Sequence, residues 1–172
     1  MKQLLNFLLI IIISILFAGI YGILHDQITF TISPEYYILL KFPQFGIENL
    51  EINTRIKVSI VGFLATWWVG LILGIVYAFI SLFLDPEKVL KVTIYSILIN
   101  LFITVIVGIL GYWFAILFLS PENIDWYIPA GTKDIRNYIN VGSIHNFGYI
   151  GGVIGLIAGV AYQIKKVKLY FK

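Results

Sequence analysis

The chain has 172 residues, of which 60% are hydrophobic and only 12% are charged, and its mean hydropathy is +0.95. This composition lies outside the range of soluble domains, and it excludes an ordinary water-soluble enzyme. The net charge of +3 is small and gives no indication of nucleic-acid binding. The length suits four membrane spans with short connections, so residues 1–172 are predicted to form a single integral membrane domain.

The charges are segregated from the apolar sequence. All 12 basic and 9 acidic residues fall outside four apolar blocks, which are Leu4–Leu24, Val58–Leu84, Val92–Leu119 and Ile144–Ile164. About 20 apolar residues in a helix cross the hydrocarbon core, and a charge at its centre costs several kcal/mol. We therefore predict an all-α membrane protein, a bundle of four transmembrane helices with spans near residues 4–24, 58–84, 90–119 and 144–164.

The first apolar block also has features of a secretory signal, because Lys2 precedes it and Ala18 and Gly19 supply small residues near its end. The apolar region of a signal peptide is only about 7–15 residues long, and Leu4–Leu24 exceeds that length. An uncleaved first span is therefore favoured. Cleavage would leave three spans.

The distribution of Lys and Arg predicts the orientation, because cytoplasmic loops retain positive charge during insertion. Three short segments contain Lys2, Lys88, Lys91, Lys165, Lys166, Lys168 and Lys172, whereas two long loops share Lys41, Arg55, Lys57, Lys133 and Arg136. Both termini are therefore expected in the cytoplasm. The long loops, His25–Lys57 and Ser120–Ser143, are expected outside, and they contain no cysteine that would form a disulfide.

Each of the three connections carries a capping residue before a Pro-Glu pair, a pattern typical of helix starts. Asp85 is expected to open the third span, whereas Ser33 and Ser120 are expected to open short helices on the outer surface. Apolar and polar residues alternate in Ile28–Ile32, a pattern that favours a strand, with Glu51–Thr54 as its partner in a small hairpin. Thr132 is expected to cap a helical stretch that leads into the fourth span.

Glycines form the clearest packing pattern. In the fourth span Gly151, Gly155 and Gly159 lie on one helical face, and the second span has Gly70 and Gly74 at the same spacing. Small residues spaced by four allow helices to approach closely. We favour packing inside the bundle over a homo-oligomer seam, since the short loops already hold the helices together.

The polar residues near the outer ends of the spans form a candidate pocket. Its members are His25, Asp26, Gln27, Glu35, Arg55, His145 and Asn146. Imidazole and carboxylate groups suit zinc and similar metals, so His25, Asp26 and His145 are weak candidate ligands, although their spacing matches no known metal motif. The simpler interpretation is that His25 and Asp26 end a helix and pair with Arg55, while His145 is solvated at headgroup depth.

Farther into the membrane, Trp67, Trp68 and Asn100 are the bulky or polar positions. Asn100 is expected to form a hydrogen bond with another helix. No charged residue lies at the middle of a span, which weakens the case for an ion-coupled transporter. The sequence contains no nucleophile motif and no phosphate-binding loop, so we predict no catalytic residue and no cofactor.

Three motifs resemble a family of small bacterial multi-pass membrane proteins of unknown function. They are Leu24-His25-Asp26-Gln27, Ser33-Pro34-Glu35-Tyr36-Tyr37 and Ala65-Thr66-Trp67-Trp68-Val69-Gly70, and they cover mainly the first half of the chain. The resemblance implies a bacterial inner-membrane protein and directs attention to the outer polar groups and the tryptophan pair. It implies no particular activity.

Three functions are compatible with these features. A non-enzymatic accessory or assembly protein is favoured, and its partners would be the lipid bilayer and another protein or a second copy of the chain, bound through glycine faces or outer loops. A small transporter or channel is the alternative, and it needs a polar path from His25 and His145 toward Asn100. A metal-dependent membrane enzyme with an outer His and Asp site is the third.

Overall fold

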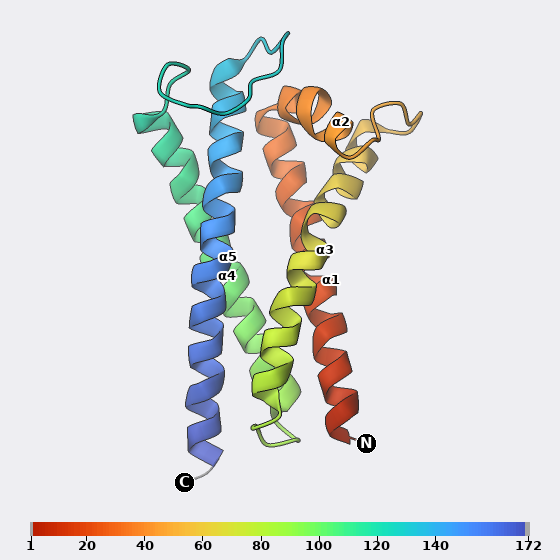
Figure 1. Ribbon diagram of the computed structural model, residues 1–172, viewed down its shortest axis with the longest axis vertical. Helices are drawn as coiled ribbons and strands as arrows, with labels where there is room; N and C mark the ends of the chain where they lie inside the picture. The colour runs from red at the N-terminus through yellow and green to blue at the C-terminus, as the bar shows by residue number, and fades with distance from the viewer. Residues whose placement is uncertain (1, 171–172) are drawn as a thin grey trace.

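The computed structural model describes the backbone of residues 2–170 and the side chains of residues 2–167. Four long helices make up most of this region: α1 (Lys2–Ile32), α3 (Thr54–Ser81), α4 (Val89–Phe118) and α5 (Ile135–Tyr170). They run side by side along the long axis, and both ends of the chain lie at the same end of the molecule (Figure 1). Each of the four is long and apolar enough to cross a membrane, so the predicted all-α, four-span architecture is confirmed.

The four helices form two pairs. α1 packs mainly against α3, and α4 packs mainly against α5, whereas contacts between the two pairs are few. The pairs are joined by a short turn at residues 82–88, where Asp85 forms an ion pair of 3.5 Å with Lys88. Sequence neighbours α3 and α4 therefore belong to different pairs and barely touch.

Glycines allow the two helices within each pair to approach each other closely. In the first pair, a Cβ atom added to Gly62 would lie 2.4 Å from the carbonyl oxygen of Gly22, so only glycine fits where α1 crosses α3. In the second pair, a Cβ atom at Gly155 would lie 2.7 Å from the carbonyl oxygen of Asn100. The glycines predicted to be packing residues, Gly70, Gly74, Gly151, Gly155 and Gly159, all contact another helix of the same chain. Gly70 and Gly74 meet α1, Gly151 and Gly155 meet α4, and Gly159 meets both α4 and Tyr77 of α3.

The outward faces of the long helices are apolar. On α1, the exposed leucines and isoleucines recur every four residues and are half or more exposed: Leu8, Ile12, Leu16, Ile20 and Leu24. A spacing of four residues places them on one face of the helix. Exposure of so much apolar surface suits contact with lipid rather than with water.

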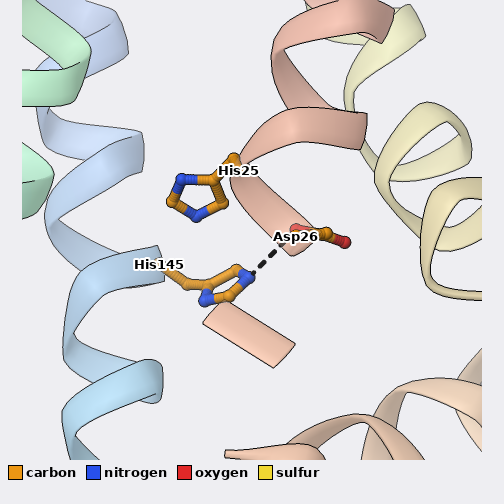
Figure 2. Close-up of side chains that lie close together, drawn as sticks. All are labelled: His25, Asp26 and His145. Carbon is orange, nitrogen blue, oxygen red and sulfur yellow. Dashed lines mark ion pairs between the residues drawn. The ribbon is translucent and has the colours of Figure 1, made fainter. Parts of the chain in front are cut away.

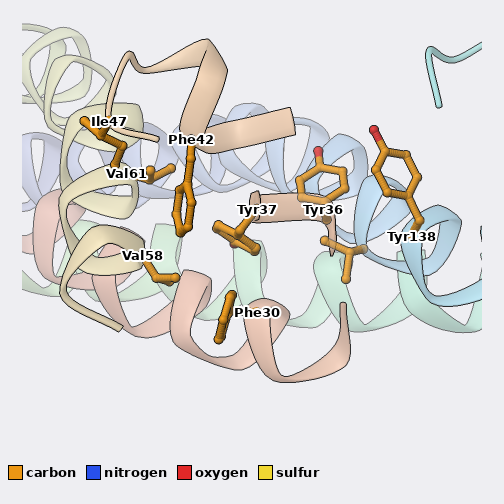
Figure 3. Packing of buried hydrophobic residues seen from close by; sticks show 9 residues of the cluster. Phe30, Tyr36, Tyr37, Phe42, Ile47, Val58, Val61 and Tyr138 are labelled. Carbon is orange, nitrogen blue, oxygen red and sulfur yellow. The ribbon is translucent and has the colours of Figure 1, made fainter. Parts of the chain in front are cut away.

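The end of the molecule opposite the termini is closed by a short helical segment. Ser33 follows the end of α1, and its Oγ lies 3.4 Å from the backbone nitrogen of Tyr36. The chain then continues through the π-helix η1 (Tyr36–Lys41) into α2 (Phe42–Gln44). The segment folds back over the bundle and buries an aromatic and aliphatic cluster against α1, α3 and α5 (Figure 3). This cluster contains Phe30, Tyr36, Tyr37, Phe42, Ile47, Val58, Val61, Tyr138 and Val141.

Several local predictions were wrong. The Ile28–Ile32 segment is the last turn of α1 and not a strand, and residues 2–170 contain no strand at all. Ser120 is followed by a turn rather than a helix. The cap of α5 is Asp134, whose Oδ1 accepts a hydrogen bond of 3.0 Å from the N–H of Asn137, and not Thr132. Ser33, in contrast, does open a short helix as predicted.

Candidate functional site

The site begins with α1, which continues past the first apolar block to Ile32. His25 and Asp26 therefore lie inside a helix and not at its end, and both side chains turn toward the second helix pair. His145 meets them from α5, ten residues after that helix begins at Ile135. Figure 2 shows the three side chains converging from the two helices. The site thus bridges the two pairs.

The three side chains are close and largely shielded from solvent. His145 Nε2 lies 3.5 Å from Asp26 Oδ1, and the ring centroids of His25 and His145 are 5.0 Å apart (Figure 2). One donor atom from each of the three residues lies within 4.8 Å of the others. Asp26 is only 4% exposed. An ionised carboxylate this buried is costly unless a positive charge or a hydrogen-bond donor lies nearby.

The hydrogen bond of His145 to its own helix determines which ring nitrogen carries the proton. Nδ1 lies 2.9 Å from the carbonyl oxygen of Val141, and a carbonyl oxygen only accepts hydrogen bonds, so Nδ1 is the donor. Nε2 therefore points at Asp26 either with a lone pair, in the neutral ring, or with a second proton, in the cationic ring.

Tyrosines surround the two imidazoles. Tyr36 stacks on His145 with a centroid distance of 5.1 Å, and Tyr21 stacks on His25 at 5.4 Å, where its hydroxyl lies 3.4 Å from His25 Nδ1. Tyr37 is fully buried, and its hydroxyl is hydrogen-bonded to that of Thr29. Burial raises the pKa of both Tyr36 and Tyr37 above the usual tyrosine value, so these phenols remain neutral. η1 thus covers the site with an aromatic layer.

A cavity of about 340 Å³ extends from this cluster between the two helix pairs. His25, Asp26, His145 and Lys41 line it near the covered end. Most of the remaining wall is apolar and comes from both helix pairs, including Ala65, Val69, Ile72, Leu101, Val153 and Leu156. Asn100 and Thr104 add polar groups farther along, toward the middle of the bundle.

The cavity does not continue through the half of the bundle nearest the termini. Its lining includes Leu73, Leu101 and Leu156, and these residues also pack against a second buried cluster that contains Ile10 and Tyr77. Ile10 and Tyr77 are both fully buried. The polar cluster and the apolar chamber therefore share one cavity that has a closed end.

Gln27 and Arg55 belong to a different site. The Arg55 guanidinium donates to the Gln27 carbonyl oxygen at 2.9 Å and to Thr31 Oγ1 at 3.1 Å, and it lies 4.7 Å from the centre of the Phe30 ring. Arg55 thus supplies hydrogen-bond donors to acceptor atoms near the end of α1. The expected pairing of His25 and Asp26 with Arg55 was wrong, because the ionic partner of Asp26 is His145.

Glu35 and Asn146 also lie outside the cluster. The Glu35 carboxylate accepts hydrogen bonds from the backbone N–H groups of Lys133, at 3.1 Å, and Asp134, at 2.8 Å. Glu35 therefore ties η1 to the start of α5 and holds the aromatic cover in place. Asn146 is exposed, although it follows His145 directly.

The three intramembrane candidates differ in position. Trp68 lines the cavity, whereas Trp67 does not, and both rings are partly exposed on α3. Asn100 is buried on α4, and its side chain donates a hydrogen bond of 3.1 Å to the carbonyl oxygen of Gly152 on α5. This is the interhelical bond expected of an amide in hydrocarbon.

Sequence reasoning missed four residues of the site: Tyr21, Tyr36, Tyr37 and Lys41. Tyr21 precedes His25 by one helical turn, a spacing that predicts contact only if the helix is known to continue past Leu24. Lys41 lines the cavity because η1 folds over it, and burial lowers the pKa of its ammonium group. The sequence predicts a short helix after Ser33, but it does not place Lys41 in a cavity beneath that helix.

Comparison with known proteins adds no functional information. No protein-family model, no curated protein and no solved structure matches the chain.

Proposed function

We propose that this protein binds a membrane amphiphile between its two helix pairs, with the polar headgroup at the His25, Asp26 and His145 cluster. The observation that carries the proposal is the composition of the cavity, which has ionisable groups at one end and a long apolar wall at the other. A lipid has the same division along its length. The apolar wall offers burial for methylene groups, each of which contributes about 0.8 kcal/mol when removed from water.

The charges around the cluster favour an anionic headgroup such as a phosphate. Lys41 lines the cavity at this end, and its ammonium group lies 5.6 Å from the centre of the Tyr36 ring. The only carboxylate among the described lining residues, Asp26, already faces His145. Lys41 and His25 remain to meet a negative headgroup, and an ionic hydrogen bond from the Lys41 ammonium group is strong in a partly buried site.

We further propose that the protein resides in a bacterial inner membrane with both termini in the cytoplasm. The support is the concentration of lysine in the short segments at the terminal end of the molecule. In this orientation the cluster lies at the depth of the outer leaflet headgroups, and the cavity extends toward the membrane centre. Binding of an amphiphile needs no catalytic group, so an accessory role, with or without a protein partner, fits the same proposal.

Transport is the second candidate, and one observation favours it. Asn100 and Thr104 line the same cavity as the two histidines, which supplies part of a polar path into the membrane. We rank it lower because the packed cluster around Ile10 and Tyr77 closes the half of the bundle nearest the termini. Transport would require that cluster to separate.

Two glycines make the main proposal testable. Gly148 and Gly152 line the cavity, and a Cβ atom added to either would meet nothing within 4 Å. Leucine at both positions is therefore expected to fill the chamber without disturbing helix packing. Protein purified in mild detergent would be analysed by native mass spectrometry and by extraction of retained lipids, and then titrated with a phospholipid of defined chain length.

The Gly148→Leu and Gly152→Leu double variant is expected to bind the phospholipid more weakly than the unchanged protein. Excluding two or three methylene groups corresponds to a loss of about 10- to 100-fold in affinity. Ile157→Phe serves as the matched control, because Ile157 is 65% exposed on the same helix and does not line the cavity. Equal lipid retention by all three proteins would contradict the proposal.

A further inference from the structure

We propose that His25, Asp26 and His145 bind one divalent transition-metal ion, with zinc as the best match. This inference goes beyond amphiphile binding, since it depends only on the arrangement of these three side chains. Two imidazoles and one carboxylate form a common protein ligand set for catalytic zinc. The ligands come from α1 and α5, so the ion would also join the two helix pairs.

Two hydrogen-bond acceptors, His145 Nε2 and Asp26 Oδ1, face each other in this cluster. Because Nδ1 of His145 donates to the Val141 carbonyl oxygen, a neutral His145 directs the Nε2 lone pair at Asp26 Oδ1, 3.5 Å away. A lone pair facing a carboxylate oxygen is repulsive, and Asp26 is nearly fully buried. A cation or a proton must therefore lie between these atoms. It is either a bound metal ion or a proton shared by the ring nitrogen and the carboxyl group.

The spacing of the ligand atoms also suits zinc. Tetrahedral zinc with bonds of about 2.0–2.1 Å places neighbouring ligand atoms about 3.4 Å apart. The separation of 3.5 Å between His145 Nε2 and Asp26 Oδ1 matches that edge. All three ligand atoms lie within 4.8 Å of one another, so binding one ion requires the longer separations to shorten by up to about 1.4 Å.

Neighbouring groups orient both imidazole rings. Histidines that bind metals usually donate their other ring N–H to a backbone carbonyl or carboxylate, which orients the ring, and His145 does so to Val141. Nδ1 of His25 contacts the Tyr21 hydroxyl, and among the described residues Nε2 of His25 has no hydrogen-bond partner. That nitrogen is therefore free to bind an ion. The stacked rings of Tyr36 and Tyr21 limit the movement of both imidazoles.

The fourth coordination position would open into the cavity, because all three residues line it. Three protein ligands with one open position characterise zinc sites that bind water or a substrate oxygen. A phosphate oxygen of the proposed headgroup is a suitable fourth ligand. The metal site does not require that headgroup, so metal binding and lipid binding can be measured separately.

The test uses the full chain purified in detergent with a peptide affinity tag that contains no histidine. After removal of metals with a chelator and dialysis, the protein is titrated with Zn²⁺ and Co²⁺. Metal content is measured by mass spectrometry, and the Co²⁺ complex by visible absorption, which reports tetrahedral coordination. We expect one ion per chain and a higher thermal unfolding temperature in its presence.

The variants His25→Gln, Asp26→Asn and His145→Gln are each expected to weaken metal affinity by about 100-fold or more, the upper range for loss of a supporting residue around a zinc ion. Asp125→Asn is the matched control, because Asp125 is an exposed carboxylate outside the cluster, and its replacement should leave affinity unchanged. Circular dichroism and size-exclusion chromatography establish that each variant is folded.

Three results would overturn the metal proposal. They are a folded, unmodified protein that binds no metal, equal metal binding by the unmodified protein and the His25→Gln and His145→Gln double variant, and Co²⁺ bound without a tetrahedral spectrum. The first result would assign the contact between His145 and Asp26 to a shared proton instead of a metal ion. The variant with leucine at residues 148 and 152 separates the two proposals, since it should lose phospholipid but retain the metal.

Discussion

At the scale of single residues, Glu35 controls how the aromatic cover sits over the histidines. Its carboxylate accepts hydrogen bonds from two backbone N–H groups, those of Lys133 and Asp134, which link η1 to the start of α5. The same short segment supplies Tyr36, which stacks on His145. A residue outside the cluster thus positions one wall of the site.

Replacing Glu35 with alanine is expected to loosen this link. Two N–H groups would lose their acceptor, and the cost of one unsatisfied buried group is about 1–3 kcal/mol, with a smaller cost in a partly exposed position. Hydrogen exchange at the amides of Lys133 and Asp134 should become faster. Glu35→Gln should show a smaller effect, because the amide oxygen still accepts one hydrogen bond, and Glu48→Ala, an exposed glutamate, should show none. Equal exchange in all variants would contradict the assigned role.

The sequence predicted the cluster residues only as part of a larger set. His25, Asp26 and Gln27 are consecutive, and successive residues on a helix point about 100° apart, as follows from 3.6 residues per turn. His25 and Asp26 reach the cavity, whereas Gln27 turns to Arg55 on α3. The sequence could not distinguish them, because the direction of each side chain depends on the rotation of α1 against α3.

At the scale of elements, the length of α1 determines that His25 and Asp26 lie within a helix. The apolar block ends at Leu24, but the helix continues to Ile32, because no proline interrupts it before Ser33 and Pro34. Proline disfavours helical conformation in the residue that precedes it, which explains the end of α1. Hydropathy locates the membrane but not the end of the helix. The prediction of a strand at Ile28–Ile32 failed for this reason.

The crossing of α1 and α3 is the least tolerant place in the first pair. A Cβ atom at Gly62 would lie 2.4 Å from the Gly22 carbonyl oxygen, and a backbone atom cannot rotate away. Gly62→Ala is therefore expected to destabilise the protein by about 3 kcal/mol, the upper range for overpacking. Thermal unfolding in detergent measures the effect. Gly148→Ala, where a Cβ atom meets nothing within 4 Å, should unfold like the unmodified protein, and equal loss in both variants would exclude close packing as the cause.

At the scale of the whole molecule, the pairing of helices follows from small residues rather than from hydropathy. All four spans are apolar around most of their circumference, so hydrophobicity does not indicate which helix packs on which. The glycine pattern predicted close contacts but not their partners. The pairing of α1 with α3 and of α4 with α5 leaves the cavity between the pairs, and this explains why its position could not be predicted from the sequence.

The orientation in the membrane gives the final prediction. The turn at residues 82–88 lies at the end of the molecule that holds both termini, and the loop at residues 119–134 lies at the opposite end (Figure 1). Each contains an exposed glutamate after a proline, Glu87 and Glu122, and the chain has no cysteine. Glu87→Cys and Glu122→Cys therefore form a matched pair of single labelling sites.

A thiol reagent that cannot cross membranes should label Glu122→Cys in intact bacterial spheroplasts and Glu87→Cys only after lysis. The reason is the retention of positive charge in the cytoplasm, since Lys88 follows Glu87 directly and Lys91 lies in the first turn of α4. The reverse pattern would place both termini outside and would move the histidine cluster to the inner leaflet. The metal and amphiphile proposals would then stand with the opposite leaflet as the source of the headgroup, because neither depends on which side the cavity faces.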